Sequence, residues 1–108
     1  MSYSVITIPP FDRQLKRLSK KYSSLKEEFL ELIISLEQNP EQGIKLSNNC
    51  FKIRIAIASK GKGKSGGARI ITNIVIEDTI VYLLSIYDKS ERETLADKEL
   101  EELLKIIS

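Results

Sequence analysis

The chain has 108 residues, with 17 lysines and arginines against 15 acids, no histidine and one cysteine, Cys50. This length predicts a single domain, residues 1–108, that buries a modest core, and a lone cysteine excludes an internal disulfide. Without histidine, neither a metal site nor a cofactor is expected. No run approaches the roughly 18 apolar residues of a membrane span, and the N-terminus lacks a signal-peptide pattern, so we expect a cytoplasmic protein with no membrane partner.

The first elements predict a strand and two helices. Residues 3–8 are short, β-branched and apolar, and Pro9-Pro10 is predicted to end this strand. Apolar residues then recur at helical spacing through 11–22 and again through 25–36. Because the link between these runs is short, they predict an αα-hairpin.

The start of the second helix carries a possible cap. Ser24 is followed three residues later by Glu27, the spacing of a capping box. This pair is therefore predicted to satisfy the first backbone N–H groups of that helix.

The most informative stretch runs from residue 51 to 76, where two alternating apolar runs flank a loop of Lys, Gly and Ser. Alternation places Lys52 and Arg54 on the face opposite the apolar residues, and Arg69 opens the second run. From Gly43 to Ile76 there is no acid but there are seven cations, namely Lys45, Lys52, Arg54, Lys60, Lys62, Lys64 and Arg69. Such a one-signed sheet surface predicts binding of a polyanion.

A third strand follows the turn at Glu77-Asp78. Its predicted apolar face is formed by Ile80, Tyr82, Leu84 and Ile86. Val81 and Leu83 then share the face of Tyr87 and would need cover from the C-terminal helix or a partner. That helix is predicted by Leu100, Leu103, Leu104 and Ile107, with Ala96 or Asp97 as its N-cap.

The element order β-α-α-β-β-β-α predicts an α+β fold with a mainly antiparallel sheet and the helical hairpin on its apolar face. Its other face is expected to hold Lys52, Arg54, Arg69, Tyr87 and Lys89. The meander brings Arg54, Arg69 and Lys89 towards one region, which favours phosphate binding.

The alternatives are a solvated hairpin tip for the lysine loop and simple surface charges on the strands. A phosphate-binding P-loop at Gly63-Lys64-Ser65 is disfavoured because Ala58 replaces its first glycine.

Two motifs, IAIASKGKGKSGGARII and VYLLSIYDKSE, resemble the RelE/ParE superfamily of bacterial toxins, most closely its HigB-like branch. The resemblance covers nearly the whole chain and implies a RelE-like fold with helices on one face and an RNA cleft on the other. It implies the toxin of a type II toxin–antitoxin system, a metal-independent endoribonuclease (mRNA interferase) that cuts mRNA in the ribosomal A site and so inhibits translation. It also implies a cognate antitoxin, usually a helix-turn-helix protein in that branch.

The resemblance assigns roles to the basic residues. The implied catalytic set is Lys60, Lys62, Arg69, Tyr87 and Lys89, and the implied RNA-binding set is Lys52, Arg54 and Lys64. RelE proper has a tyrosine near its C-terminus, where this chain has Leu95 and Ala96, so Tyr87 is the nearest substitute. Neighbouring cations are expected to lower the pKa of such a tyrosine or lysine, while Arg69 and Lys89 offset the charge of the phosphorane.

Two other functions stay open. ParE-like members share the fold but inhibit DNA gyrase through a protein contact. A non-catalytic RNA-binding module would use the same basic surface without cutting RNA.

Overall fold

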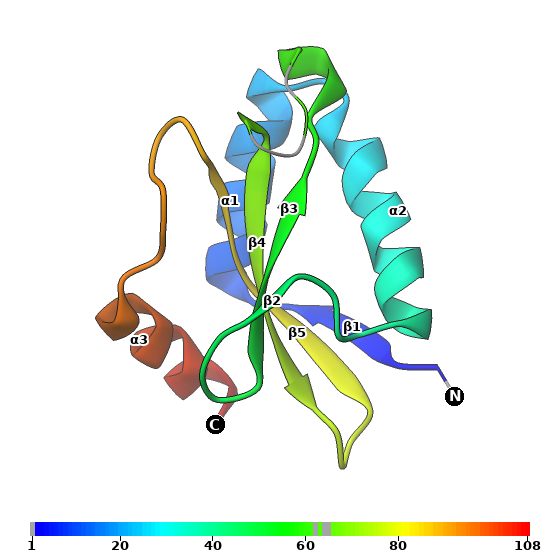
Figure 1. The fold of residues 1–108 in the computed structure, drawn as a ribbon, viewed down its shortest axis with the longest axis vertical. Coiled ribbons are helices and arrows are strands. Elements are labelled where there is room, and N and C mark those ends of the chain that lie inside the picture. Colours follow the sequence, from blue (N-terminus) through cyan, green and yellow to red (C-terminus); the bar gives the residue numbers. More distant parts are fainter. Residues whose placement is uncertain (1, 62, 64–65) are drawn as a thin grey trace.

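The computed structural model describes residues 2–61, 63 and 66–108 (Figure 1). The described elements are β1 (Ser4–Thr7), α1 (Pro9–Lys21), α2 (Leu25–Gln38), β2 (Ile44–Lys45), β3 (Cys50–Ile55), the 3-10 turn η1 (Ala58–Lys60), β4 (Ala68–Val75), β5 (Ile80–Asp88) and α3 (Asp97–Ile107). The strands form one sheet in the order β1-β5-β4-β3-β2. Only the pair of β1 with β5 is parallel among these described strands, which confirms the predicted α+β fold with a mainly antiparallel sheet.

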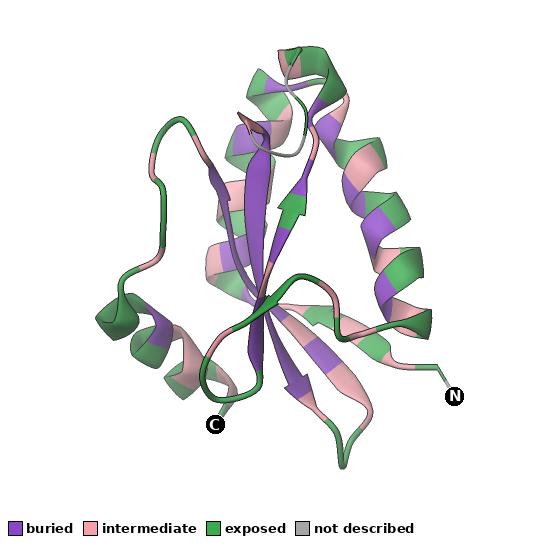
Figure 2. Cartoon of the chain, viewed as in Figure 1, coloured by how far each residue is buried: buried purple, intermediate pink, exposed green. Residues whose placement is uncertain are grey.

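The helical hairpin α1–α2 begins directly after β1. Pro9 and Pro10 end the strand as predicted, and they also open α1. Proline suits the first turn of a helix because its missing N–H would have no partner there. Phe11 and Leu18 of α1 and Leu25 of α2 are fully buried in the core shared with the central strands β4 and β5 (Figure 2).

The predicted capping box at Ser24 is wrong. Ser24 is the N-cap residue, but its hydroxyl makes no cap bond. Instead it donates to the Glu28 carboxylate (3.1 Å) and accepts the backbone N–H of Ser59 (2.9 Å), while Glu28 also accepts the N–H of Ala58 (2.8 Å). These hydrogen bonds attach η1 to the start of α2. The turn η1 leads into the loop of Lys, Gly and Ser.

A bulge in β5 changes which residues face the helices. Ile70 lies opposite Ile86, but the register shifts beside Ile71, so Thr72 lies opposite Leu83. Ile70 and Thr72 share a face, so Leu83, and likewise Val81, lie on the helical-hairpin side. Both are fully buried, and the prediction that they lie on the cationic face is wrong.

The C-terminal helix α3 covers part of the face opposite the hairpin. A small cavity of about 180 Å³ is lined by Lys52 and Ile71 of the sheet together with Leu95 and Leu100 of the C-terminal segment. Ala96 is the N-cap, and its backbone N–H donates to the Glu99 carboxylate (3.4 Å). The expectation that the helices lie on one face of the sheet therefore holds for α1 and α2. Helix α3 instead borders the opposite face, beside the basic residues. Among the described segments, no helix combines the length and apolar character needed to cross a membrane.

We expect Gly67→Ala to destabilise the β3–β4 pair. A Cβ at Gly67 would lie 2.0 Å from the backbone oxygen of Ile55, which cannot move without disrupting the sheet. Such overpacking should lower the free energy of unfolding by about 2–3 kcal/mol. Gly63→Ala is the matched control, since a Cβ there meets nothing within 4 Å. Equal urea midpoints for the two variants would contradict this account.

Candidate active site

Three residues on adjacent strands form a strip across the sheet. Arg54 of β3 lies directly opposite Arg69 of β4, and Arg69 lies directly opposite Tyr87 of β5. Side chains directly opposite on neighbouring antiparallel strands have Cβ atoms about 5 Å apart. We call Arg54, Arg69 and Tyr87 the Arg–Tyr strip; it lies on the face opposite the helical hairpin.

Burial changes the acid–base properties of the Arg–Tyr strip. Arg69 is 3% exposed and Tyr87 4%, whereas Arg54 is exposed. Burial lowers the pKa of the Arg69 guanidinium, and the charge of Arg54 lowers it further. Burial raises the pKa of Tyr87, although the charges of Arg92 and Arg69 oppose this. The neighbouring cations do favour a lower Tyr87 pKa, as expected, but desolvation of the phenolate outweighs them and the pKa is raised overall.

The Tyr87 hydroxyl is buried without a hydrogen-bond partner among the described residues. A buried donor left unsatisfied costs about 1–3 kcal/mol, so such groups are few in native proteins. With its pKa raised, Tyr87 is a neutral phenol at physiological pH. It is suited to donate a hydrogen bond or a proton to a bound anion.

A further cation at this site, Arg92, was not predicted. Its guanidinium lies 5.4 Å from the centre of the Tyr87 ring and is held by the carboxylate of Glu99 in the first turn of α3. Arg92 lies in the charged link after β5. The sequence of this link has no periodicity that would indicate which way a side chain points. Sequence alternation therefore could not place it over Tyr87.

The remaining predicted residues lie at varying distances from the strip. Lys89 follows β5 directly, and its Nζ lies 4.0 Å from the Glu93 carboxylate. Lys52 lies two residues before Arg54 on the same face and lines the cavity beside α3. Lys62 and Lys64 lie outside the described residues, so their predicted roles stay predictions.

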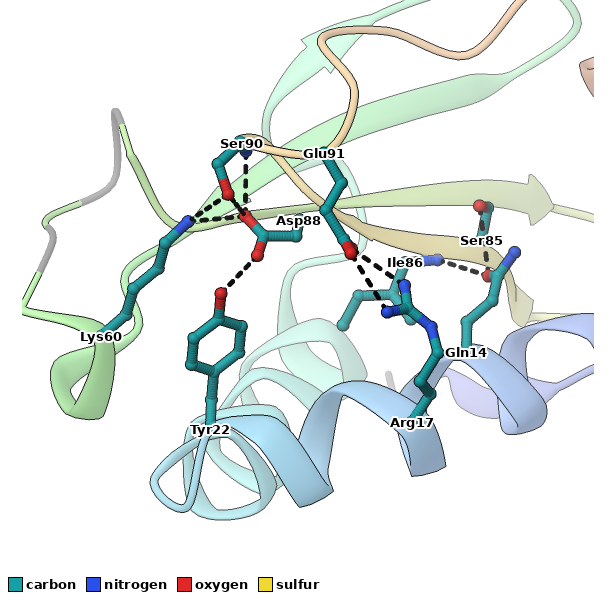
Figure 3. Close-up of polar contacts among 9 residues, drawn as sticks. All are labelled: Gln14, Arg17, Tyr22, Lys60, Ser85, Ile86, Asp88, Ser90 and Glu91. Carbon is teal, nitrogen blue, oxygen red and sulfur yellow. Dashed lines mark hydrogen bonds and ion pairs between the residues drawn. The ribbon is translucent and has the colours of Figure 1, made fainter.

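Lys60, which the resemblance places in the catalytic set, lies in a cluster of polar side chains at the end of β5 (Figure 3). It ends η1, and its Nζ donates to Asp88 Oδ1 (2.6 Å), Gly66 O (2.9 Å) and Ser90 Oγ (3.0 Å). Asp88 lies opposite Ala68, on the helical-hairpin side of the sheet. The structure therefore does not bring the Lys60 ammonium together with the Arg–Tyr strip.

Asp88 is the centre of this second cluster. It is fully buried and also accepts hydrogen bonds from Tyr22 OH (2.5 Å), the Ser90 hydroxyl (2.7 Å) and the Ser90 N–H (2.9 Å). Burial alone would raise the pKa of Asp88, but hydrogen bonds from Lys60, Tyr22 and Ser90 hold it far below its usual range. We call Tyr22, Lys60, Asp88 and Ser90 the Asp88 clamp. The further bond from Lys60 to the backbone oxygen of Gly66 joins the two ends of the loop of Lys, Gly and Ser, and the clamp attaches them to the end of β5.

We expect a titration to detect the raised pKa of Tyr87. The difference in ultraviolet phenolate absorbance between the wild type and Tyr87→Phe isolates this one group. Its midpoint should lie above the ordinary value of about 10. A midpoint below that value would show that Arg92 and Arg69 dominate over burial.

The structure thus combines a mainly antiparallel sheet, a helical hairpin on one face, and the buried Arg69 and Tyr87 on the other. A family model described as "RelE toxin of RelE / RelB toxin-antitoxin system" matches residues 11–108. The chain therefore belongs to the RelE toxin family.

Solved structures share the fold. A double arginine-to-alanine variant of the Escherichia coli toxin RelE in the free state has a TM-score of 0.64 at 19% identity, covering 100% of both chains. The Mycobacterium tuberculosis toxin–antitoxin complex RelBE2 gives 0.60 at 18% identity, covering 82% of this chain and 99% of that one. The E. coli variant bound to a peptide of the antitoxin RelB gives 0.58 at 19% identity, covering 94% of both chains. At these identities the likeness establishes the fold.

Proposed function

We propose that this toxin of a type II toxin–antitoxin system is an endoribonuclease that cuts mRNA in the ribosomal A site. The observation that carries the proposal is the buried hydroxyl of Tyr87, which makes no hydrogen bond among the described residues, on the residue directly opposite Arg69. A phenol donor beside a guanidinium suits a phosphate that gains charge during reaction.

In the proposed reaction the ribose 2′-oxygen attacks the adjacent phosphorus and its hydroxyl proton passes to water. The bond to the 5′-oxygen breaks, which leaves a 2′,3′-cyclic phosphate, and Tyr87 regains its proton from water after the step. Arg69 and the exposed Arg54 stabilise the negative phosphorane, and Tyr87 gives its proton to the departing 5′-oxygen. Lys89 supplies a further cation at the end of β5. The proposal assigns no step to a metal.

The proposal makes the ribosome necessary for two reasons. Neither Arg69 nor protonated Tyr87 is a base near neutral pH, so attack depends on the 2′-hydroxyl being held in line with the scissile bond. Arg69 and Tyr87 are also nearly inaccessible, so this end of the sheet must open for RNA to reach them. Lys52, Lys62 and Lys64 are proposed to bind the RNA backbone, and Lys60 to position the loop through the Asp88 clamp.

We also propose that a cognate antitoxin neutralises this toxin. The family description names a toxin–antitoxin system, and two of the similar structures are complexes with antitoxin. A helix-turn-helix antitoxin, the HigB-like branch and a cytoplasmic location stay predictions from the sequence resemblance. Copurification of the product of a neighbouring gene with the toxin would test whether such an antitoxin exists.

The test is a reconstituted translation extract with a defined message. The proposal expects cuts in phase with codons that require ribosomes and are missing with Arg69→Ala. Intact message together with inhibited DNA gyrase would favour the ParE-like alternative. Retarded but uncut message would favour the RNA-binding module.

A further inference from the structure

Strand β5 loses one of its two neighbouring strands before it reaches Tyr87. Strand β1 pairs with β5 only as far as Leu83, because the chain then turns into α1. Strand β5 continues to Asp88, so beyond Leu83 its pairing partner among the described strands is β4 alone. The backbone groups on the other edge of this segment therefore need partners from outside the sheet.

A side chain of α1 supplies such a partner at Ile86. The Oε1 atom of Gln14 accepts the backbone N–H of Ile86 (2.9 Å) and the hydroxyl of Ser85 (3.3 Å) (Figure 3). A backbone N–H can only donate, so the amide oxygen of Gln14, and not its nitrogen, faces β5. Ser85 and Ile86 are each 1% exposed, so water cannot replace this acceptor unless the structure opens locally.

The Gln14 contact lies one residue before Tyr87. Leu84 is the extra residue of the bulge in β5, which makes the pairing with β4 irregular just before this contact. On the C-terminal side of Tyr87, the hydrogen bonds of the Asp88 clamp hold the strand. Gln14 supplies the corresponding contact on the N-terminal side, so the backbone of Tyr87 is fixed from both directions along the chain.

We propose that Gln14 is a positioning residue for Tyr87, which acts by holding the β5 backbone at Ile86. A movement of Ile86 would carry the phenol of the next residue with it. Displacement of a catalytic group by about 1 Å can cost up to about 100-fold in rate. This inference rests on the proposed function, in which Tyr87 gives its proton to the departing 5′-oxygen.

The variants separate the acceptor at position 14 from the packing of the side chain. Gln14→Met keeps the length of the side chain but removes the oxygen, whereas Gln14→Glu keeps an oxygen acceptor at the same reach. If Gln14→Met does not fold, Gln14→Asn takes its place, because its side chain is one methylene shorter. Gln38→Met is the matched control, since Gln38 is exposed at the end of α2.

Three measurements report on cleavage, on the contact and on the phenol. Single-turnover cleavage over a range of ribosome concentrations separates the rate at saturation from the concentration that gives half of it. Amide hydrogen exchange at Ile86 reports whether its N–H keeps an acceptor. The NMR signals of the Tyr87 ring report whether the phenol has moved. Each rate is corrected for the folded fraction of the variant.

Gln14→Met should lower the saturating cleavage rate about 10- to 100-fold and leave the half-saturating ribosome concentration within about twofold of the wild type. Its Ile86 amide should exchange faster and its Tyr87 ring signals should shift. Gln14→Glu should recover the rate to within about fivefold of the wild type, and Gln38→Met should cut normally. In a Tyr87→Phe background, Gln14→Met should slow cleavage less than about threefold further, because it acts through the phenol.

A wild-type saturating rate for Gln14→Met would overturn the inference, as would a loss confined to the half-saturating concentration. An undiminished loss in the Tyr87→Phe background would overturn it too. So would a Gln14→Glu variant that is as slow as Gln14→Met while its Ile86 amide stays protected. If the wild type does not cut message on ribosomes, the proposed function fails, and the Tyr87 ring signals still decide whether Gln14 positions that residue.

Discussion

Arg69→Ala is expected to lower the single-turnover rate of mRNA cleavage on programmed ribosomes by about 100-fold or more. Arg69 lies in the middle of the Arg–Tyr strip, between Arg54 and Tyr87. Removing a preorganised donor aimed at a charge that develops in the transition state typically costs this much. In cells the same change should remove toxicity at equal expression.

Two further variants control for lost packing and for lost charge. Arg69→Lys keeps the charge but loses the planar two-pronged donor, so it should stay strongly impaired. Arg54→Ala removes an exposed cation from the same strip and should cost clearly less. Circular dichroism melting must show that each variant is folded. A folded Arg69→Ala variant that cuts at the wild-type rate would exclude Arg69 from the chemistry.

Asp88→Asn is expected to cause a large loss of stability. The change leaves the Lys60 ammonium, whose side chain is 13% exposed, without its anionic partner. Removing one member of a buried ion pair typically costs 3–5 kcal/mol, a large fraction of a total that is commonly about 5–15 kcal/mol. Asp78→Asn, at an exposed turn, is the matched control and should change stability by less than about 0.5 kcal/mol.

The pH dependence of Asp88→Asn has a definite sign. Because the folded pKa of Asp88 lies below its unfolded value of about 4, the carboxylate contributes stability above that value and loses it as pH falls towards the folded pKa. The difference between wild type and variant should therefore be largest above about pH 5 and shrink in acid. Urea denaturation at several pH values measures this, and a difference that grows in acid would contradict the clamp.

A double-mutant cycle tests whether Lys60 and Asp88 act as a pair. Once Asp88 is asparagine, Lys60→Met should cost less than it does in the wild type, with a coupling of at least about 1 kcal/mol. Additive losses would show that the 2.6 Å contact contributes no specific stability.

Much of the candidate site followed from side-chain alternation in the strands. Arg54 and Arg69 were assigned to one face correctly because both lie in regular, directly paired parts of the sheet. The face of Tyr87 was also predicted correctly, because Tyr87 lies on the C-terminal side of the bulge in β5, where the pairing with β4 is regular. Val81 and Leu83 lie before the bulge, and no glycine marks it in the sequence, so their side was predicted wrongly.

Lys60 and Arg92, whose positions the sequence did not predict, lie outside the strands and the α-helices. The long side chain of Lys60 can reach either side of the sheet, and its direction is set by Asp88, which the sequence showed only as the start of a charged link. Arg92 belongs to the same link and is directed by Glu99. Such side chains are placed by ion pairs with residues of other segments, and these pairs have no sequence periodicity.

The central claim is that the chemistry takes place at the Arg–Tyr strip, while the Asp88 clamp holds the fold. The most direct test is single-turnover cleavage on saturating programmed ribosomes, comparing Tyr87→Phe with Lys60→Met, each corrected for its folded fraction. Tyr87→Phe removes one hydroxyl that makes no hydrogen bond among the described residues. We expect it to slow cleavage about 100-fold or more, and Lys60→Met to slow it less than about fivefold. A nearly normal rate for Tyr87→Phe with an inactive, fully folded Lys60→Met would place the chemistry at Lys60 and contradict this account.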